Sequence, residues 1–306
     1  MPRLKAVQAL LDDFAAQRPL RGGSLIVTVF GDSISQHGNS VWLGSIIDAL
    51  EPFGLNSRLI RTAVHRLVQE GWLTATTVGR RAYYSFTDAG LRRYKKAAKR
   101  IYAARPADWD GGWTVVIHGK LEEETRDRLR KELSWLGYGV INTNLLLHPS
   151  DGRVGLYETL HDLGVAEDVV VMDALTAEIS SERALQQLAM ASWPLQELAQ
   201  RYEEFITRFR PVQRALKRVG TIPPEDGFQV RTLLVHEYRR ILLRDSDLPA
   251  QLLPEQWVGS QALELVTDIY RLVGEAAETY LLQSMATAEG PLPAALPSYQ
   301  HRFGGL

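Results

Sequence analysis

The sequence predicts an α+β protein of three successive domains, because the spacing of apolar residues changes twice along its 306 residues. Residues 20–105 combine helical stretches with one pair of short alternating strands. Residues 108–185 alternate between strand and helix, and residues 190–286 are helical throughout. The segment 287–306 is rich in proline and glycine, so we expect a loose C-terminal tail.

Three helices are predicted at the start of the first domain, over residues 24–37, 41–50 and 57–70. Asp32 interrupts the apolar pattern of the first helix, which indicates a bend there. Ser57 is a favourable N-cap for the third helix, because its hydroxyl can accept a hydrogen bond from an amide of the first turn. The short connection between the second and third helices is typical of a helix-turn-helix.

A two-stranded ribbon is predicted next, from two alternating stretches at 72–77 and 82–87. Arg80 and Arg81 lie at its tip, and a long basic helix follows, capped by Thr87 or its neighbour. Helix, turn, helix and ribbon in this order predict a winged helix-turn-helix. That fold places one helix in the major groove of DNA and a basic loop near the phosphates.

The third helix has an apolar face for the domain core and a polar face that can contact DNA. An outward arginine near the start of such a helix can make two hydrogen bonds to guanine. Any surface helix also has a polar face, so the neighbouring turn, ribbon and positive charge are what favour DNA binding. The predicted contact residues are Ser57, Arg58, Arg61, Thr62, His65 and Arg66 of the helix, with Arg80 and Arg81 of the ribbon.

The charge is distributed unevenly along the chain. Residues 1–105 hold 16 Lys and Arg against 7 Asp and Glu, a net charge of +9, whereas the remaining residues carry −10. A basic first third is what contact with phosphates requires, although basic segments also serve solubility.

The second domain is predicted to be a small ferredoxin-like sheet with helices on one face. Strands are expected at 113–119 and 168–175, and helices at 121–137 and 155–164. The stretch 139–149 reads either as one strand or as two strands joined by a bend, and two strands complete a βαββαβ order.

Several segments together resemble the PaaX-type repressors of phenylacetic acid degradation. They include NSRLIRTAVHRLVQEGWL, WTVVIHG, LGYGVINTNLLLHP and HEYRRILLRDSDLPAQLLPEQW, and the resemblance extends over residues 24–286. It implies a transcriptional repressor with a winged helix, a middle domain similar to the Cas2 fold and an all-helical C-terminal domain. It also implies that residues 57–70 are the recognition helix and that phenylacetyl-CoA, or a related aryl-acyl-CoA, is the inducer.

The helical region contains candidate ligand-binding residues. The stretch 231–245 is apolar nearly all round, which predicts a buried helix, yet His236, Arg239 and Arg240 share one of its faces. Buried arginines need anionic partners. Those partners are either acidic residues of the fold, such as Glu237, or the phosphates of a CoA thioester. The ligand-binding candidates are His236, Arg239, Arg240, Arg244 and Trp257.

We expect no enzymatic activity, metal or cofactor. The chain has no cysteine and no GxSxG, Walker or GxGxxG motif, and Arg240 stands where an HExxH motif needs its second histidine. The Cas2-like order leaves one alternative, a nucleic-acid-processing or interaction protein built on the middle domain. A metal-dependent nuclease needs carboxylates at the first strand of that domain, and WTVVIHG has none.

Simple features of the sequence predict where the protein acts, and the symmetry of operators predicts how it assembles. No apolar run is long enough to cross a membrane. The amphipathic start carries acidic residues, so we expect a mature cytoplasmic N-terminus. A homodimer is expected, paired through the middle domain, because two-fold symmetry matches a palindromic operator.

Overall fold

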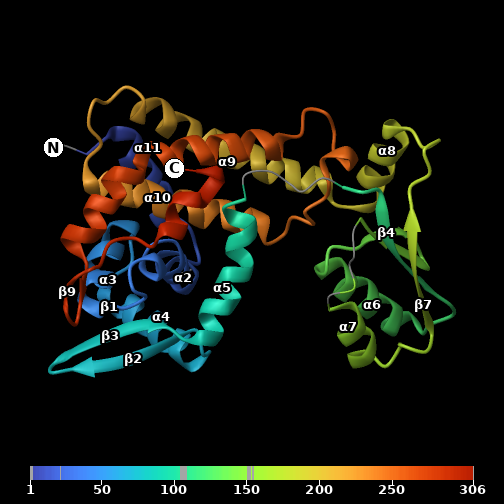
Figure 1. The fold of residues 1–306 in the computed structure, drawn as a ribbon, viewed down its shortest axis with the longest axis horizontal. Coiled ribbons are helices and arrows are strands. Elements are labelled where there is room, and N and C mark those ends of the chain that lie inside the picture. Colours follow the sequence, from blue (N-terminus) through green and yellow to red (C-terminus); the bar gives the residue numbers. More distant parts are fainter. Residues whose placement is uncertain (1–2, 21, 104–108, 150–152, 154, 306) are drawn as a thin grey trace. The chain divides into compact units, whose positions relative to one another are not determined.

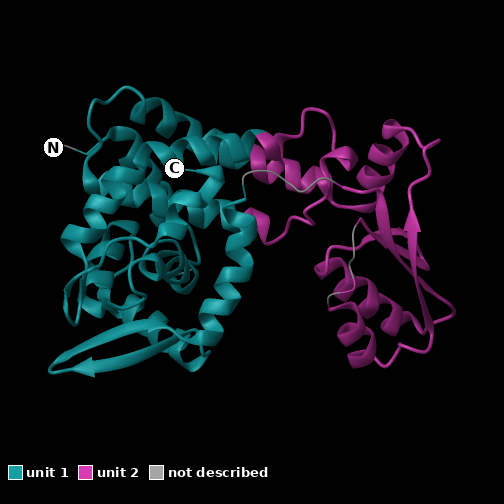
Figure 2. Ribbon diagram, viewed as in Figure 1, with its two compact units in different colours: residues 1–104, 204–240, 261–306 teal, residues 105–203, 241–260 magenta. Residues whose placement is uncertain are grey.

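The computed structural model describes residues 3–20, 22–103, 109–149, 153 and 155–305 (Figure 1). The chain forms two compact units (Figure 2). Unit 1 consists of residues 1–104, 204–240 and 261–306, and unit 2 consists of residues 105–203 and 241–260. Unit 1 therefore combines the N-terminal region with most of the helical region. The division into three domains stays a prediction.

The N-terminal part of unit 1 follows the predicted order of elements. It contains α1 (Lys5–Ala15), α2 (Gly22–Asp32), η1 (Ile34–Gln36), β1 (Val41–Trp42), α3 (Leu43–Leu50), η2 (Glu51–Phe53), α4 (Ser57–Gln69), β2 (Leu73–Val78), β3 (Arg81–Phe86) and α5 (Asp88–Ile101). The predicted bend near Asp32 is confirmed, because α2 ends there and a 3-10 turn follows. Thr87 caps α5 by accepting a hydrogen bond from the Gly90 amide at 2.9 Å.

Two local predictions were wrong. Asn56, not Ser57, is the N-cap of α4: its backbone is extended and its side chain accepts a hydrogen bond from the Leu59 amide at 2.9 Å, whereas Ser57 is already helical. Val41 and Trp42 were assigned to a helix but form strand β1, which pairs with β3 and gives the sheet order β1-β3-β2. The bulky Val-Trp pair suits a strand, and its register with Tyr83 and Tyr84 becomes visible only in three dimensions.

The helical part of unit 1 is built around α10. The long helices are α9 (Leu195–Leu216), α10 (Pro224–Leu242) and α11 (Val258–Ser284), and each contributes residues to both units. Leu233, Leu234 and Val235 of α10 are buried, which confirms the predicted buried helix over most of residues 231–245, but the helix ends at Leu242 and Leu243 is 57% exposed. No helix among the described residues is long and apolar enough to span a bilayer.

The C-terminal tail is not loose, contrary to the prediction from its composition. It forms a short hairpin of β8 (Ala286–Thr287) and β9 (Gly290–Pro291) and the 3-10 segment η4 (Pro297–Gly304). The Phe303 amide donates to the Tyr102 carbonyl at 2.9 Å, and the Leu296 amide donates to the backbone carbonyl of Gln36 at 2.8 Å. Proline and glycine disfavour regular structure, but they do not prevent Tyr299 and Phe303 from being buried.

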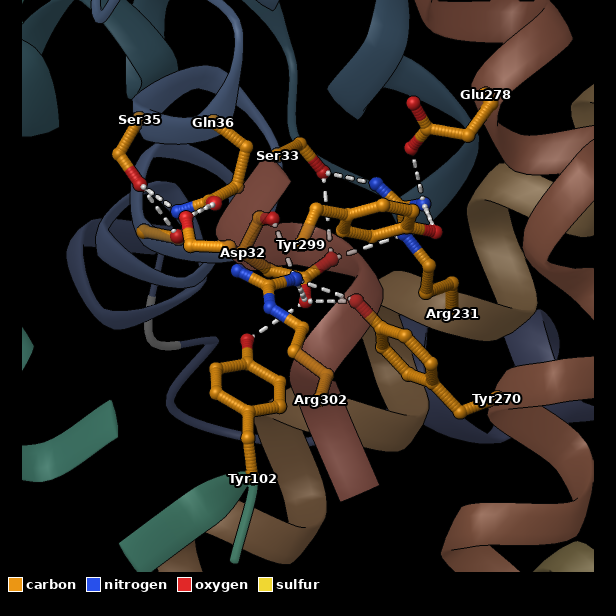
Figure 3. A network of polar contacts seen from close by, with 12 residues as sticks. Asp32, Ser33, Ser35, Gln36, Tyr102, Arg231, Tyr270, Glu278, Tyr299 and Arg302 are labelled. Atoms are coloured by element: carbon orange, nitrogen blue, oxygen red, sulfur yellow. Dashed lines mark hydrogen bonds and ion pairs between the residues drawn. The ribbon is translucent and has the colours of Figure 1, made fainter. Parts of the chain in front are cut away.

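A buried polar network ties this tail to α2 (Figure 3). Asp32, at the end of α2, lies 2.9 Å from Arg231 Nε of α10 and 2.9 Å from Arg302 Nη1 of η4. The hydroxyls of Tyr102 and Tyr270 donate to the same carboxylate at 2.6 and 2.9 Å. Although burial opposes ionisation, the two arginines and the two tyrosine hydroxyls lower the pKa of Asp32.

The network extends from Arg231 to Glu278 of α11. Arg231 is fully buried, and its Nη1 lies 2.7 Å from Glu278 Oε1. The other carboxylate oxygen of Glu278 lies 3.1 Å from His37 Nε2. Burial opposes ionisation of Glu278, but the hydrogen bond with His37 and the charge of Arg231 prevail and lower its pKa from 4.5 to about 2.

Unit 2 contains a ferredoxin-like sheet. Its elements are β4 (Gly112–His118), α6 (Glu123–Trp135), β5 (Gly139–Asn142), β6 (Leu145–His148), α7 (Leu156–Asp162), β7 (Val169–Leu175), α8 (Glu182–Ser192) and η3 (Ala250–Leu252). The strands are antiparallel in the order β5-β6-β4-β7, the arrangement of a split βαββαβ unit. The stretch 139–149 is thus two strands. Val116 and Leu146 of the sheet form one core with Leu129, Leu133 and Leu160 of the helices.

We expect Glu278→Gln to weaken the fold in a pH-dependent way. A lowered pKa in the folded state means that ionised Glu278 stabilises the fold, fully above about pH 4.5 and less as the pH falls towards about 2. The variant should lose on the order of 3 kcal/mol at pH 7 and retain little of this pH dependence. Urea unfolding at pH 7 and at about pH 3 measures both effects.

Glu275→Gln is the matched control, because Glu275 lies on the same helix and is exposed. Glu275→Gln should change neither the free energy of unfolding nor the dependence of that free energy on pH. If Glu278→Gln unfolds at the same urea concentration as the wild type at pH 7, the ion pairs of Glu278 do not stabilise the protein.

Candidate nucleic-acid interface

Helix α4 has one buried and one exposed face. Ile60, Val64 and Leu67 are buried against unit 1, and α4 has the high amphipathicity of a surface helix. The six residues predicted to contact DNA from this helix are all exposed: Ser57, Arg58, Arg61, Thr62, His65 and Arg66. Their side chains are therefore accessible to a partner.

The exposed face of α4 is nearly free of competing contacts. Arg61 Nε donates to Ser57 Oγ at 3.3 Å, and Thr62 donates to the carbonyl of Arg58 at 2.9 Å, both within the helix. None of its three arginines forms an ion pair with a carboxylate in the described part of the chain. Uncompensated guanidinium groups on one helix face suit an anionic partner.

The ribbon ends in a two-residue turn at Gly79 and Arg80, since Val78 and Arg81 are paired across it. Gly79 has a φ of 61°, a left-handed conformation that favours glycine. Arg80 and Arg81 are both exposed, but they are held differently. The guanidinium of Arg81 lies 4.6 Å from the centre of the Trp42 ring, a cation–π contact that anchors the ribbon to β1.

Helix α5 extends the basic surface. It buries Tyr94 and Ile101 and exposes Arg92, Arg93, Lys95, Lys96 and Lys99. Tyr94 packs over Gly31 of α2, where a β-carbon would lie only 1.9 Å from the ring. This close approach gives a physical reason for the glycine in the middle of α2, which the sequence alone did not explain.

Two of the candidate ligand residues hold α10 against α2. His236 is buried, and its Nδ1 lies 3.2 Å from the Thr28 hydroxyl. Arg239 Nη2 donates to Ser24 Oγ at 2.8 Å, and burial lowers the pKa of Arg239. Both contacts join the helical region to the first helix of the predicted DNA-binding domain.

Arg240 has the internal partner that the sequence suggested, because its Nη1 lies 3.2 Å from Glu237 Oε1. Arg208 of α9 lies 3.4 Å from the same carboxylate. Arg240 also lines a cavity of about 360 Å³ together with His236 and Arg18. These ion pairs favour the structural alternative for Arg240, and a ligand-binding role for it stays a prediction.

The two remaining candidates belong to unit 2. Arg244 is exposed just beyond the end of α10. Trp257 is partly buried, with its ring edge-on to Tyr202 at 6.2 Å. The hydroxyl of Tyr202 in turn donates to Asp245. The five candidates are thus divided between the units, and the structure joins His236 and Arg240 in one cavity.

The buried network of Asp32, Arg231 and Arg302 was not predicted from the sequence. One signal was present, because an aspartate inside an apolar helix needs a buried partner. The partners could not be identified, since Arg231 and Arg302 lie 199 and 270 residues further along the chain.

Comparisons with known proteins place the chain among regulators. Family models match successive segments: PaaX-like protein over residues 21–90, PaaX protein central Cas2-like domain over 106–186, and PaaX-like protein C-terminal domain over 193–283. Transcriptional repressor PaaX of Escherichia coli (strain K12) is 39% identical over 289 residues, which cover 94% of this chain and 92% of the relative. The resemblance found in the sequence is thereby confirmed.

A solved structure shows a similar fold. Uncharacterized protein Rv0674 from Mycobacterium tuberculosis matches with a TM-score of 0.56 over 83% of this chain and 95% of its own. Its sequence identity is 21%, so the likeness concerns the fold alone.

Proposed function

Because the chain belongs to the PaaX-like protein family, we propose that it is a transcriptional repressor that binds double-stranded operator DNA of a phenylacetate catabolic pathway and is released by phenylacetyl-CoA. The observation that carries the proposal is the 39% identity to a transcriptional repressor over 94% of this chain. The family is one of regulators, in agreement with the expectation that the chain is not an enzyme. Such a repressor acts in the cytoplasm, where bacterial DNA lies.

The proposed winged helix reads DNA through α4. Its exposed side enters the major groove, and Arg58 and Arg61 near its N-terminus reach the edges of the bases. Each bidentate arginine–guanine contact contributes about 1–3 kcal/mol of discrimination between bases. Arg80 at the tip of the ribbon contacts phosphates, which adds affinity with little sequence preference.

Release follows from a shift between two conformations. The inducer binds one conformation more tightly, and that conformation has the lower affinity for DNA. The contacts of α10 with α2 through His236 and Arg239 support this coupling. A displacement of α10 changes the position of α2, and α2 carries α4 and α5 with it by packing.

We also propose that two copies pair through the ferredoxin-like sheet. Strand β7 lies at the edge of the sheet and pairs with β4 alone among the described strands. Val170 and Met172 of β7 are 57% and 44% exposed, on the face opposite the core-packed Val169 and Val171, so the strand at this unpaired edge has an exposed apolar face. An exposed apolar edge strand is normally covered by a partner, and a second copy is the partner that two-fold operators require.

The alternative of a nuclease finds no support in the same sheet. Metal-dependent cleavage needs carboxylates that hold a divalent cation. Strand β4 contains none between Gly112 and His118, and the two ring nitrogens of His118 lie 2.8 and 3.0 Å from the carbonyls of Gly119 and Thr143.

We expect this protein to retard an operator fragment in a gel-shift assay and to release it when phenylacetyl-CoA is added. Free phenylacetate and free CoA should have little effect, because each supplies only part of the contacts. Retention that does not change with the thioester contradicts the proposed inducer. If the operator fragment binds no more tightly than a random duplex, the proposed function as a repressor is contradicted.

Substitutions should separate base contacts from phosphate contacts. We expect Arg61→Ala to reduce operator binding by about 1–3 kcal/mol and to relax base preference at one position. Arg80→Ala should weaken all duplexes alike and lower the slope of log K against log salt by about one. Arg210→Ala, an exposed arginine of α9, is the control. Wild-type affinity in both of the first two variants shows that other residues contact DNA.

Charge on strand β7 should disrupt pairing. We expect Val170→Asp combined with Met172→Asp to change the mass in light scattering from that of two chains to that of one. Tyr157→Asp, at an exposed site on α7, should leave it unchanged. If the β7 variant keeps the mass of two chains, the copies pair through another surface.

A further inference from the structure

A groove in unit 1 has the features of a ligand site, and its lining contains no residue of α4. It is a cavity of about 560 Å³ between α5 and the C-terminal tail, and we call it the α5 groove. Its α5 wall is one helical stripe, formed by Leu91, Tyr94, Lys95, Ala98, Lys99 and Tyr102. The facing wall includes Gln36, Leu296, His301 and Arg302. The volume falls within the range of about 300–1,000 Å³ that is common for sites of small molecules.

The groove is positively charged at its rim. Lys95 and Lys99 are exposed, and neither forms an ion pair with a carboxylate in the described residues. The lining contains no carboxylate among the described residues, and Asp32, which contacts the lining residue Arg302, also faces Arg231. Two lysines on adjacent turns therefore lack a neutralising partner among the residues that the structure describes, and an anion can supply one.

Arg302 contributes hydrogen-bond donors to the wall of the groove. Arg302 is only 6% exposed and lines the groove. Its three hydrogen bonds to described residues all leave from Nη1. A guanidinium has five N–H donors, so Nε and Nη2 remain available to a ligand. The ion pair with Asp32 holds the guanidinium of Arg302 in place. Its Cζ lies 4.0 Å from the centre of the Tyr102 ring, and this stacking orients the guanidinium.

Apolar surface completes the site. Leu91, Ala98 and Leu296 present apolar side chains, and Tyr94 adds an aromatic ring. A simple inorganic anion uses none of this surface. A ligand that fills the groove therefore combines a charged end with an apolar or aromatic body.

We propose that the α5 groove binds a phosphate-bearing organic anion, with its phosphate oxygens on Lys95, Lys99 and Arg302 and its apolar part against Leu91, Tyr94 and Leu296. In its link to the inducer this inference rests on the proposed function, since an acyl-CoA carries both phosphates and apolar groups. The proposal assigns the phosphate-bearing part of such a ligand to unit 1.

DNA is the other anion that these lysines could meet. The observations favour a small ligand, because the lysines stand beside a cavity with buried donors, whereas backbone phosphates are usually met by side chains on open surfaces. Arg92 and Lys96 lie on α5 outside the groove lining and provide an internal comparison. If Lys95 and Lys99 contact DNA, their substitution should have the same effect on binding as substitution of Arg92 and Lys96.

The position of the groove gives binding a consequence for α2. Tyr102 and Arg302 line the groove and at the same time hydrogen-bond to Asp32 at the end of α2. A phosphate on Nε and Nη2 of Arg302 adds a second anion to the guanidinium that already pairs with Asp32 through Nη1. Binding therefore changes the contacts that hold α2 and the tail, and DNA affinity changes with them.

The test is isothermal titration of the full chain with phenylacetyl-CoA, adenosine 3′,5′-bisphosphate and inorganic phosphate. Three forms are compared: the wild type, Lys95→Gln with Lys99→Gln, and Arg92→Gln with Lys96→Gln. Both variants remove two positive charges from α5. We expect the groove variant to bind both organic probes at least about tenfold more weakly, because it loses two charge-assisted contacts. The second variant should stay within about twofold of the wild type.

Each outcome decides a separate claim. If the wild type binds phenylacetyl-CoA and the groove variant binds it equally well, the groove proposal fails and the proposed inducer stands. If the wild type binds the bisphosphate through the two lysines but not the thioester, the groove stands and the inducer fails. If both variants lose the same amount of affinity for the organic probes, and both also lose affinity for operator DNA, Lys95 and Lys99 are DNA contacts and the proposal is overturned. Inorganic phosphate that binds as tightly as the bisphosphate also overturns it, as does a wild type that binds no probe.

Discussion

The structure of unit 1 depends on the buried carboxylate of Asp32. A charge removed from water is costly unless opposite charges and hydrogen bonds surround it. Here they come from four places in the chain: Arg231 of α10, Tyr270 of α11, Tyr102 at the end of α5 and Arg302 of the tail. The carboxylate therefore requires these elements to meet at one point, and their apolar side chains pack around it.

This requirement makes the N-terminal and C-terminal regions one cooperative unit. The helix that presents the predicted DNA-contacting face packs on α2, and α2 ends in Asp32. The helices that follow residue 204 and the tail contact the same end of α2. A buried charge that several elements contact at once couples the positions of those elements.

Positive charge on α4, the ribbon and α5 has different surroundings in each place. On α4 it is exposed and largely unpaired, on the ribbon Arg81 is stacked on Trp42, and on α5 Lys95 and Lys99 border a cavity. Residue type alone does not distinguish a base contact, a structural cation–π pair and a ligand contact. The surrounding surface makes the distinction, because an open face suits a duplex and an enclosed, partly apolar one suits a small molecule.

Short stretches of the sequence were enough to predict the local elements, and its longer motifs were enough to predict the family. The alternation of residues in β2 and β3, the apolar β-branched run of β4 and the helical spacing in α4 are properties of short windows, and the structure has these elements at nearly the predicted bounds. The spacing in α10 predicted a helix over residues 231–245, whereas α10 spans Pro224–Leu242. The three-dimensional packing was needed to establish that the tail is packed, that Val41 and Trp42 form a strand, and that Asp32 contacts Arg231 and Arg302. Those features depend on residues tens to hundreds of positions apart. Local propensity carries no information about such partners, because they are brought together only when the core is packed.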